Sequence, residues 1–190
     1  MTNNQAGGLS FRNARALAIF IVVLCVSFVA DRVLPLEQFG LRPRSLEGLT
    51  GIVAMPLLHA DLAHLSSNLV PLILLMAMLI ATQPRPLITA LMISLLGGAL
   101  TWLFARNGNH IGASGLVFGL ATCLIVGGYR SRSMLAFAAA GITAVVYGTT
   151  LLSGVMPASG RVSWDGHLAG AVAGIVVARY YLRPSNHLSR

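Results

Sequence analysis

Residues 112–128 read GASGLVFGLATCLIVGG, a run without a single charged side chain. This run predicts a transmembrane helix that begins near Ser114 and stops before Arg130. A helix from Ser114 to Gly128 is only about 22 Å long at 1.5 Å per residue, whereas the hydrocarbon core is about 30 Å thick. If the C-terminal end of this helix reaches the membrane interface on its side, Ser114 must lie below the opposite membrane surface. Residues 106–112 must then descend as irregular backbone, which lipid permits only where the chain lines a cavity or is wrapped by protein.

The composition of the whole chain indicates a membrane protein. Hydrophobic residues make up 56% of the 190 residues and charged residues 9%, against roughly 25% charged in a soluble domain. So few charges cannot cover a water-soluble surface, and intrinsic disorder requires low hydrophobicity. Apolar runs suited to spans occur at residues 16–34, 64–83, 87–105, 114–128, 134–155 and 166–182. We therefore predict an all-α polytopic membrane protein, a single bundle of six transmembrane helices.

The arginines predict how the bundle is oriented. All 13 basic residues are arginine, and eight of them lie in the tails and in the loops after the second and fourth runs, where there is no acid. The other loops hold five arginines and all five acids. The positive-inside rule then places both termini in the cytoplasm of a multi-pass protein, expected in the inner (plasma) membrane. The predicted boundaries are a cytoplasmic N-terminal tail at 1–13, a six-span domain at 14–183 and a C-terminal tail at 184–190. Residues 1–10 and 184–190 are expected to lack regular structure.

Polar side chains within the apolar runs are candidate functional residues, because they are expensive in hydrocarbon. His64 and Asn68 are four residues apart and share one face of a helix, with His59 just upstream. Ser114 starts its helix, where free backbone N–H groups suit an oxyanion. His167 starts the last run. Beside this histidine runs a stripe of small residues at four-residue spacing, namely Gly166, Gly170 and Gly174. Such a stripe lets another helix approach closely.

Each of these features also has a structural interpretation. The histidine–asparagine pair could serve as a hydrogen bond between helices. Ser114 could be a helix N-cap in a small-residue contact, and His167 could be a capping or interfacial residue. Arg106 and His110, in the loop that leads to Ser114, are expected to be solvated.

Several catalytic groups are absent from the sequence, which narrows the possible reaction mechanisms. Without lysine there is no Ser–Lys dyad; without an acid in the middle of a run there are no paired membrane aspartates; and the HExxH metalloprotease motif is absent. Histidine remains as the acid–base group near neutral pH. Four of the five histidines share the predicted side of Ser114. The arginines form no basic run with interleaved aromatics, so a nucleic-acid partner is not expected.

Three motifs now stand in order along the chain: HADLAHLSSN at 59–68, GASG at 112–115 and HLAGAVAG at 167–174. Together they resemble the motifs of the rhomboid intramembrane serine proteases. The resemblance implies a six-helix fold of the minimal bacterial type and cleavage of transmembrane segments in membrane-protein substrates, with no metal or other cofactor. The partners it implies are those substrates and the lipid bilayer.

The resemblance also implies roles for single residues. Ser114, the serine of GxSG, would be the nucleophile, and His167 would be its base and later the acid to the leaving amine. His64 and Asn68 would donate to the oxyanion together with the Ser114 N–H. Asp165 lies two residues from His167 and is expected on another face, which leaves a dyad.

The remaining matches are supporting residues. His59 would support its loop, and Gly112 would permit close approach around the nucleophile. Phe118 falls where the family places an aromatic that stacks on the catalytic histidine, and the matching helix-packing glycines are Gly170 and Gly174. One departure is in the first loop, 31–63, which contains Arg42-Pro-Arg44 and no tryptophan, where the family often has a Trp-Arg pair.

Three alternative functions remain open from the sequence. A rhomboid-like protein can capture membrane clients without cutting them, although such relatives typically lack the serine or the histidine. A metal protein could use His59, His64 and His167, but no carboxylate completes a convincing ligand set. A small transporter would be expected to contain inverted repeats, and none is apparent.

Overall fold

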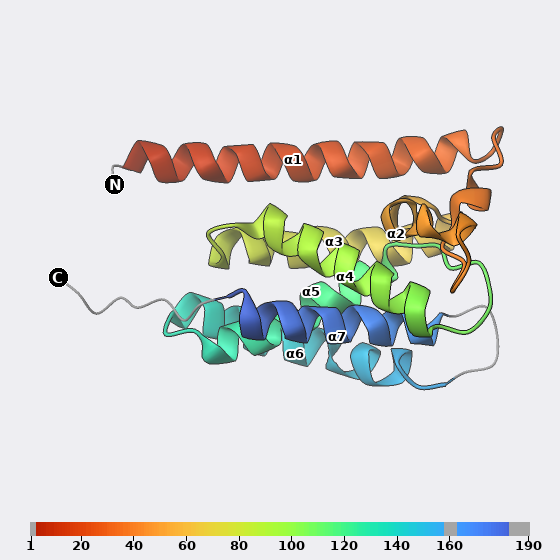
Figure 1. Cartoon of the computed structure of the whole chain (residues 1–190). Coiled ribbons are helices and arrows are strands. Elements are labelled where there is room, and N and C mark those ends of the chain that lie inside the picture. The colour runs from red at the N-terminus through yellow and green to blue at the C-terminus, as the bar shows by residue number, and fades with distance from the viewer. Residues whose placement is uncertain (1–2, 158–162, 183–190) are drawn as a thin grey trace.

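The computed structural model describes residues 3–157 and 163–182, and all the regular elements in this part of the chain are helical. The long helices are α1 (Asn3–Ala30), α3 (Leu62–Thr82), α4 (Pro86–Phe104), α5 (Ser114–Arg130), α6 (Met134–Gly154) and α7 (Trp164–Tyr180). Short elements occupy the first loop: η1 (Leu36–Phe39), η2 (Glu47–Leu49), α2 (Gly51–Ala54) and η3 (Met55–Leu57). The long helices run side by side, and the start of α1 lies at the same end of the bundle as the end of α7 (Figure 1).

The helices confirm the predicted all-α membrane bundle. Four are long and apolar enough to cross a membrane by length and composition, namely α1, α3, α4 and α6. The other two, α5 and α7, have 17 residues each, which is short for a core about 30 Å thick. The number of six spans is therefore approximate. Large apolar side chains cover the outer surface, such as Val26 (60% exposed) and Val145 (84% exposed), as expected of a surface that faces lipid.

The N-terminal tail differs from the expectation in its secondary structure. Residues 3–10, predicted to lack regular structure, are helical and continue into the first apolar run as part of α1. Once a helix exists, each added residue contributes a hydrogen bond without a new nucleation cost, so the helix extends past the apolar run. The C-terminal tail, 184–190, lies outside the described residues.

Helix α5 lies at the centre of the bundle and packs against α7 at backbone distance. Residues 115–121 are all buried, which explains why this helix is apolar on all faces. A Cβ atom added to Gly170 would overlap the carbonyl of Gly115, and one added to Gly174 would overlap the carbonyl of Gly119. The four-residue stripe on α7 therefore sets the close α5–α7 separation and brings the N-terminal ends of both helices together.

The first loop holds the segment that leads to Ser114. Leu41 and His110 exchange backbone hydrogen bonds of 2.9 and 2.8 Å in an antiparallel bridge. Two residues before the serine, the Gly112 N–H donates to the Met55 carbonyl at 2.9 Å. These bonds satisfy the irregular backbone that the short α5 requires.

The same loop docks on α4 through an arginine. Arg44 donates to the Ala105 carbonyl at 2.7 Å and to Asn107 Oδ1 at 2.6 Å, so its guanidinium satisfies a carbonyl at the C-terminal end of α4. A tryptophan also contributes to this contact, but it belongs to α4 and not to the loop. Trp102 on α4 donates its Nε1–H to the Ser45 carbonyl in the loop at 2.9 Å. A loop without tryptophan is thus anchored by its own arginine and by an indole of the neighbouring helix.

Candidate active site

Ser114 and His167 lie within hydrogen-bonding distance at the centre of the site. Ser114 is the first residue of α5 and His167 is in the first turn of α7. The distance from Ser114 Oγ to His167 Nε2 is 2.9 Å, and both residues are half-buried. The pair meets because the glycine contacts draw α5 and α7 together just below it.

The His167 ring is held from two sides. Its Nδ1 lies 2.9 Å from the carbonyl oxygen of Gly154, the last residue of α6. Because a carbonyl can only accept, Nδ1 carries the proton, and the Nε2 of the neutral ring is left to accept from the serine hydroxyl. Phe118 stacks on the ring, with centroids 4.2 Å apart and planes 13° apart. Nothing in the sequence singled out Gly154, because the group involved is a backbone carbonyl.

Asp165 makes other contacts. Its carboxylate accepts from the Arg106 backbone N–H at 2.7 Å, from the Gly166 N–H at 3.1 Å and from the Ser163 hydroxyl at 3.2 Å. Arg106 Nε also donates to it at 3.2 Å. The hydrogen bonds of this carboxylate therefore tie the start of α7 to the loop before α5, and the group that faces His167 Nδ1 is the Gly154 carbonyl.

His110 is not solvated, and the expectation for it was wrong. Only 6% of this residue is exposed. Its ring shares a 2.6 Å hydrogen bond with Ser163 Oγ and a 2.9 Å hydrogen bond with the Arg106 carbonyl oxygen. Arg106 keeps a side chain that is 47% exposed, paired with Asp165. The partner serine is 53 residues away in the chain, so no local pattern could indicate the contact.

His64 and Asn68 lie next to Gly112, in the loop that leads to Ser114. Asn68 is 3% exposed and donates from Nδ2 to the His64 carbonyl at 2.9 Å. Gly112 has φ of 110°, a conformation that favours glycine. A Cβ atom there would lie 2.5 Å from His64 Nε2 and 3.6 Å from Asn68 Nδ2. Glycine therefore lets both side chains lie against the backbone two residues before Ser114.

His59 is fully buried behind this group. Its Nε2 accepts from the Ala113 N–H at 3.4 Å, and its ring meets that of His64 edge-on at a centroid distance of 5.0 Å. Burial, and then the charge of His64, lower the pKa of His59 to about 4, against a smaller opposing effect of the Leu57 carbonyl. The ring is therefore neutral near pH 7. It supports the backbone at the start of α5.

His59, His64 and His167, which the sequence left open as metal ligands, are not grouped as a ligand set. Among residues 3–157 and 163–182, no three histidine, cysteine, aspartate or glutamate side chains are placed so that they could hold a metal ion.

Comparison with known proteins identifies the family. A Rhomboid domain profile matches residues 47–184, well over half of the chain. An uncharacterized protein of Mycobacterium tuberculosis (strain H37Rv) is 42% identical over 153 residues, which cover 75% of this chain and 63% of the relative. An uncharacterized protein of Mycobacterium leprae is 39% identical over 160 residues, covering 75% and 60%. The chain thus spans about three fifths of the length of these curated relatives. On the match of the domain profile, the chain belongs to the rhomboid family.

Proposed function

We propose that this chain is an active intramembrane serine endopeptidase that cleaves transmembrane segments of membrane-protein substrates through Ser114 and His167. The observation that supports it most is the 2.9 Å approach of Ser114 Oγ to His167 Nε2, with the opposite ring nitrogen engaged by a carbonyl. Nucleophile, base and orienting group are the parts that activation of a serine requires. The proposed setting is the plasma membrane, with both termini in the cytoplasm and the protease unit at residues 14–183.

In the first half of the reaction, Ser114 Oγ attacks the scissile carbonyl while His167 Nε2 takes its proton. The Nδ1–H remains hydrogen-bonded to the Gly154 carbonyl, and the dipole of that carbonyl stabilises the imidazolium that forms. His167 then donates the Nε2 proton to the leaving amine as the C–N bond breaks, and the acyl group stays on Ser114. Water attacks this ester, His167 acts as base again, and the serine is regenerated.

The tetrahedral intermediates place negative charge on the former carbonyl oxygen. Ser114 begins α5, so its N–H has no acceptor within the helix, and the helix N-terminus favours negative charge. His64 and Asn68 lie against the same loop. We assign these three donors to the oxyanion, a contribution worth about 10²–10³ in rate for one donor in other serine proteases.

The substrate must be locally unwound near the nucleophile. A continuous helix keeps its carbonyls in intrahelical hydrogen bonds, so the scissile segment should contain helix-breaking glycine or proline. The 17-residue length of α5 indicates that Ser114 lies below the membrane surface. This position favours cleavage of peptide bonds near one end of the substrate's transmembrane span.

Client binding without cleavage is the second candidate. It predicts that the protein binds membrane segments while its serine is not activated. The intact Ser114–His167 hydrogen bond gives no reason to prefer it.

Cleavage of single-span proteins tests the proposal. The purified chain is reconstituted in vesicles with a panel of such proteins that carry glycine or proline near the external end of the span. We expect cleavage by wild type and by Ser153→Ala, a nearby exposed serine used as matched control. Ser114→Ala and His167→Ala should leave the substrate intact. Cleavage retained by folded Ser114→Ala would refute the assignment.

A further inference from the structure

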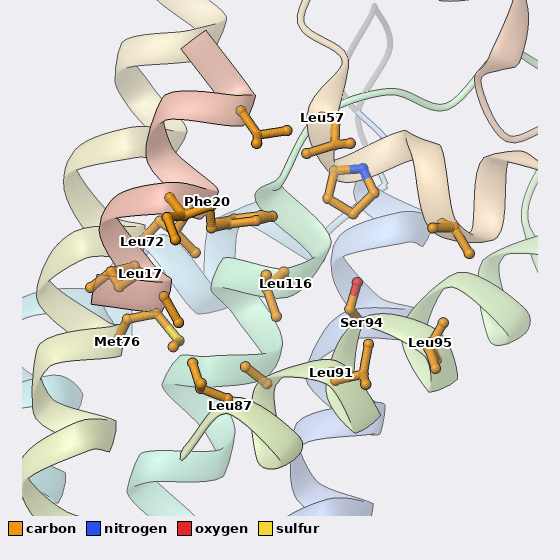
Figure 2. Close-up of a pocket in the computed structure, with 16 residues that line it drawn as sticks. Leu17, Phe20, Leu57, Leu72, Met76, Leu87, Leu91, Ser94, Leu95 and Leu116 are labelled. Carbon is orange, nitrogen blue, oxygen red and sulfur yellow. The ribbon is translucent and has the colours of Figure 1, made fainter. Parts of the chain in front are cut away.

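The structure contains an apolar cleft that neither Ser114 nor His167 lines. Its volume is about 430 Å³, and it is formed by α1, the first loop, α3, α4 and α5. Figure 2 shows Leu17 and Phe20 of α1 on one side and Leu91 and Leu95 of α4 on the other. It plays no part in the proposed cleavage reaction.

The chemistry of the cleft suits hydrocarbon. Of the sixteen residues that line it, Ser94 alone has a polar side chain. Several lining residues are exposed on the outer surface of the bundle, for example Ile19 at 54% and Leu91 at 56%. The cleft therefore opens sideways from the bundle, where it faces lipid and where water would have almost nothing to hydrogen-bond to.

One end of the cleft is bordered by arginines. On α1, Arg12 precedes the lining residue Ala16 by four residues, and Arg15 precedes Ile19 by four. Residues four apart share a helix face about 6 Å apart along the axis, so both arginines continue the cleft face by one turn. Arg85 immediately precedes α4, two residues before the lining residue Leu87. All three arginines are exposed.

These arginines have no acidic neighbours in their part of the fold. All five acids of the chain belong to the opposite end of the bundle: Asp31, Glu37, Glu47, Asp61 and Asp165. The ion pairs found among the described residues likewise join Arg32, Arg42 and Arg106 to acids at that opposite end. Among residues 3–157 and 163–182, the positive charge at this end of the cleft therefore has no acidic side chain to compensate it.

We propose that the cleft between α1 and α4 is a binding site for an anionic phospholipid. One acyl chain occupies the apolar cleft, and the phosphate pairs with Arg12, Arg15 and Arg85. Arginine favours phosphate because its planar fork can donate two hydrogen bonds to it. Basic pockets between transmembrane helices are known sites for anionic headgroups.

A substrate helix fits this cleft less well. A helix with side chains is about 10 Å wide and rises 5.4 Å per turn, so one turn takes up roughly 420 Å³. A segment that spans the bilayer needs five or more turns, or roughly 2,100 Å³ at that volume per turn, so the cleft could hold only a part of it. A narrow, flexible acyl chain can occupy the same volume without leaving most of its length outside.

The site is tested by lipid retention in the full-length Ser114→Ala protein, so that the result does not depend on protease activity. Native mass spectrometry compares the retention of phosphatidylglycerol with that of phosphatidylcholine of identical chains. We expect one tightly held phosphatidylglycerol. An arginine near an anionic lipid contributes roughly fivefold in affinity, so the double variant Arg12→Gln/Arg15→Gln should bind it about 25-fold more weakly. The matched control is Arg130→Gln/Arg132→Gln, at the end of α5 and in the turn that follows it on the same side of the bundle, and it should keep the lipid.

The acyl-chain half of the site is tested by filling the cleft. Ser94→Phe should abolish retention of the lipid, whereas Leu103→Phe, an exposed position of α4 outside the cleft, should not. Equal retention of both lipids, or full retention by Ser94→Phe, would overturn the proposal. So would a photocrosslinker at Leu91 that captures a single-span protein in place of lipid.

Discussion

Gly154→Ala disturbs the two contacts that hold the His167 ring, the Gly154 carbonyl and the stacked Phe118. The Gly154 backbone is not in the left-handed region, so alanine can adopt its conformation. The added methyl group would overlap Cζ of Phe118 and lie 2.8 Å from its Cε1 and 3.4 Å from His167 Nδ1. Carbon atoms pack at about 3.5–4.0 Å, so relieving the overlap with Cζ requires the stacked rings or the end of α6 to shift by about 1 Å or more.

A shift of that size should impair activation of the serine. Misplacement of a reacting group by about 1 Å can cost on the order of 10²-fold in rate. We therefore expect reaction with a fluorophosphonate to slow by about 10- to 100-fold, or roughly 1.4–2.7 kcal/mol in activation free energy. The rate constant for labelling of the detergent-solubilised protein measures this loss without a substrate.

Gly148→Ala is the matched control on the same helix. A Cβ atom there meets nothing within 4 Å, and alanine stabilises a helix interior by about 0.5–1 kcal/mol relative to glycine. Its labelling rate should equal that of wild type. If folded Gly154→Ala labels within about twofold of wild type, the reasoning that the carbonyl and the stacked ring position His167 is refuted.

Three further predictions concern the oxyanion, the buried histidine and the first loop. Asn68→Ala should lower kcat by about 10²–10³ with little change in KM, as measured by cleavage kinetics with a thermal unfolding control. The folded-state pKa of His59 is about 4 against 6.5 unperturbed, so the unfolded chain takes up its proton first as pH falls. Stability should be full above pH 6.5 and fall by about 3 kcal/mol towards pH 4, and a thermal unfolding series should show a flatter profile for His59→Gln. Arg44→Ala should lower unfolding stability by about 1.5–3 kcal/mol through loss of its bonds to α4, whereas Arg42→Ala, which loses an exposed ion pair, should cost under about 1 kcal/mol; equal effects would contradict the docking role of Arg44.

The membrane bundle was predictable because lipid penalises every polar group. That penalty makes apolar runs and rare polar residues stand out, and it places Ser114 at the start of a short helix. The extent of α1 was not predictable, because helix elongation beyond an apolar run is not recorded in hydropathy. The first-loop anchor was missed as well, since Arg44 reaches carbonyls about 60 residues away in the chain.

The sequence indicated which residues could meet, while the structure gives their geometry. Glycines at four-residue spacing predict close helix packing, but the spacing does not say that the partner of α7 is α5. Gly154 was missed because its contribution to the site is a carbonyl that any residue has. His110 was misjudged because loop position predicts solvation on average, whereas this ring is enclosed by Ser163 and the Arg106 backbone.

Labelling with a fluorophosphonate serine probe, with the adduct located by peptide mass spectrometry, tests the central claim most directly. An activated serine predicts a single adduct on Ser114 in wild type and in Ser153→Ala, and none in Ser114→Ala or His167→Ala. A correctly folded wild-type protein without an adduct on Ser114 would contradict the protease assignment.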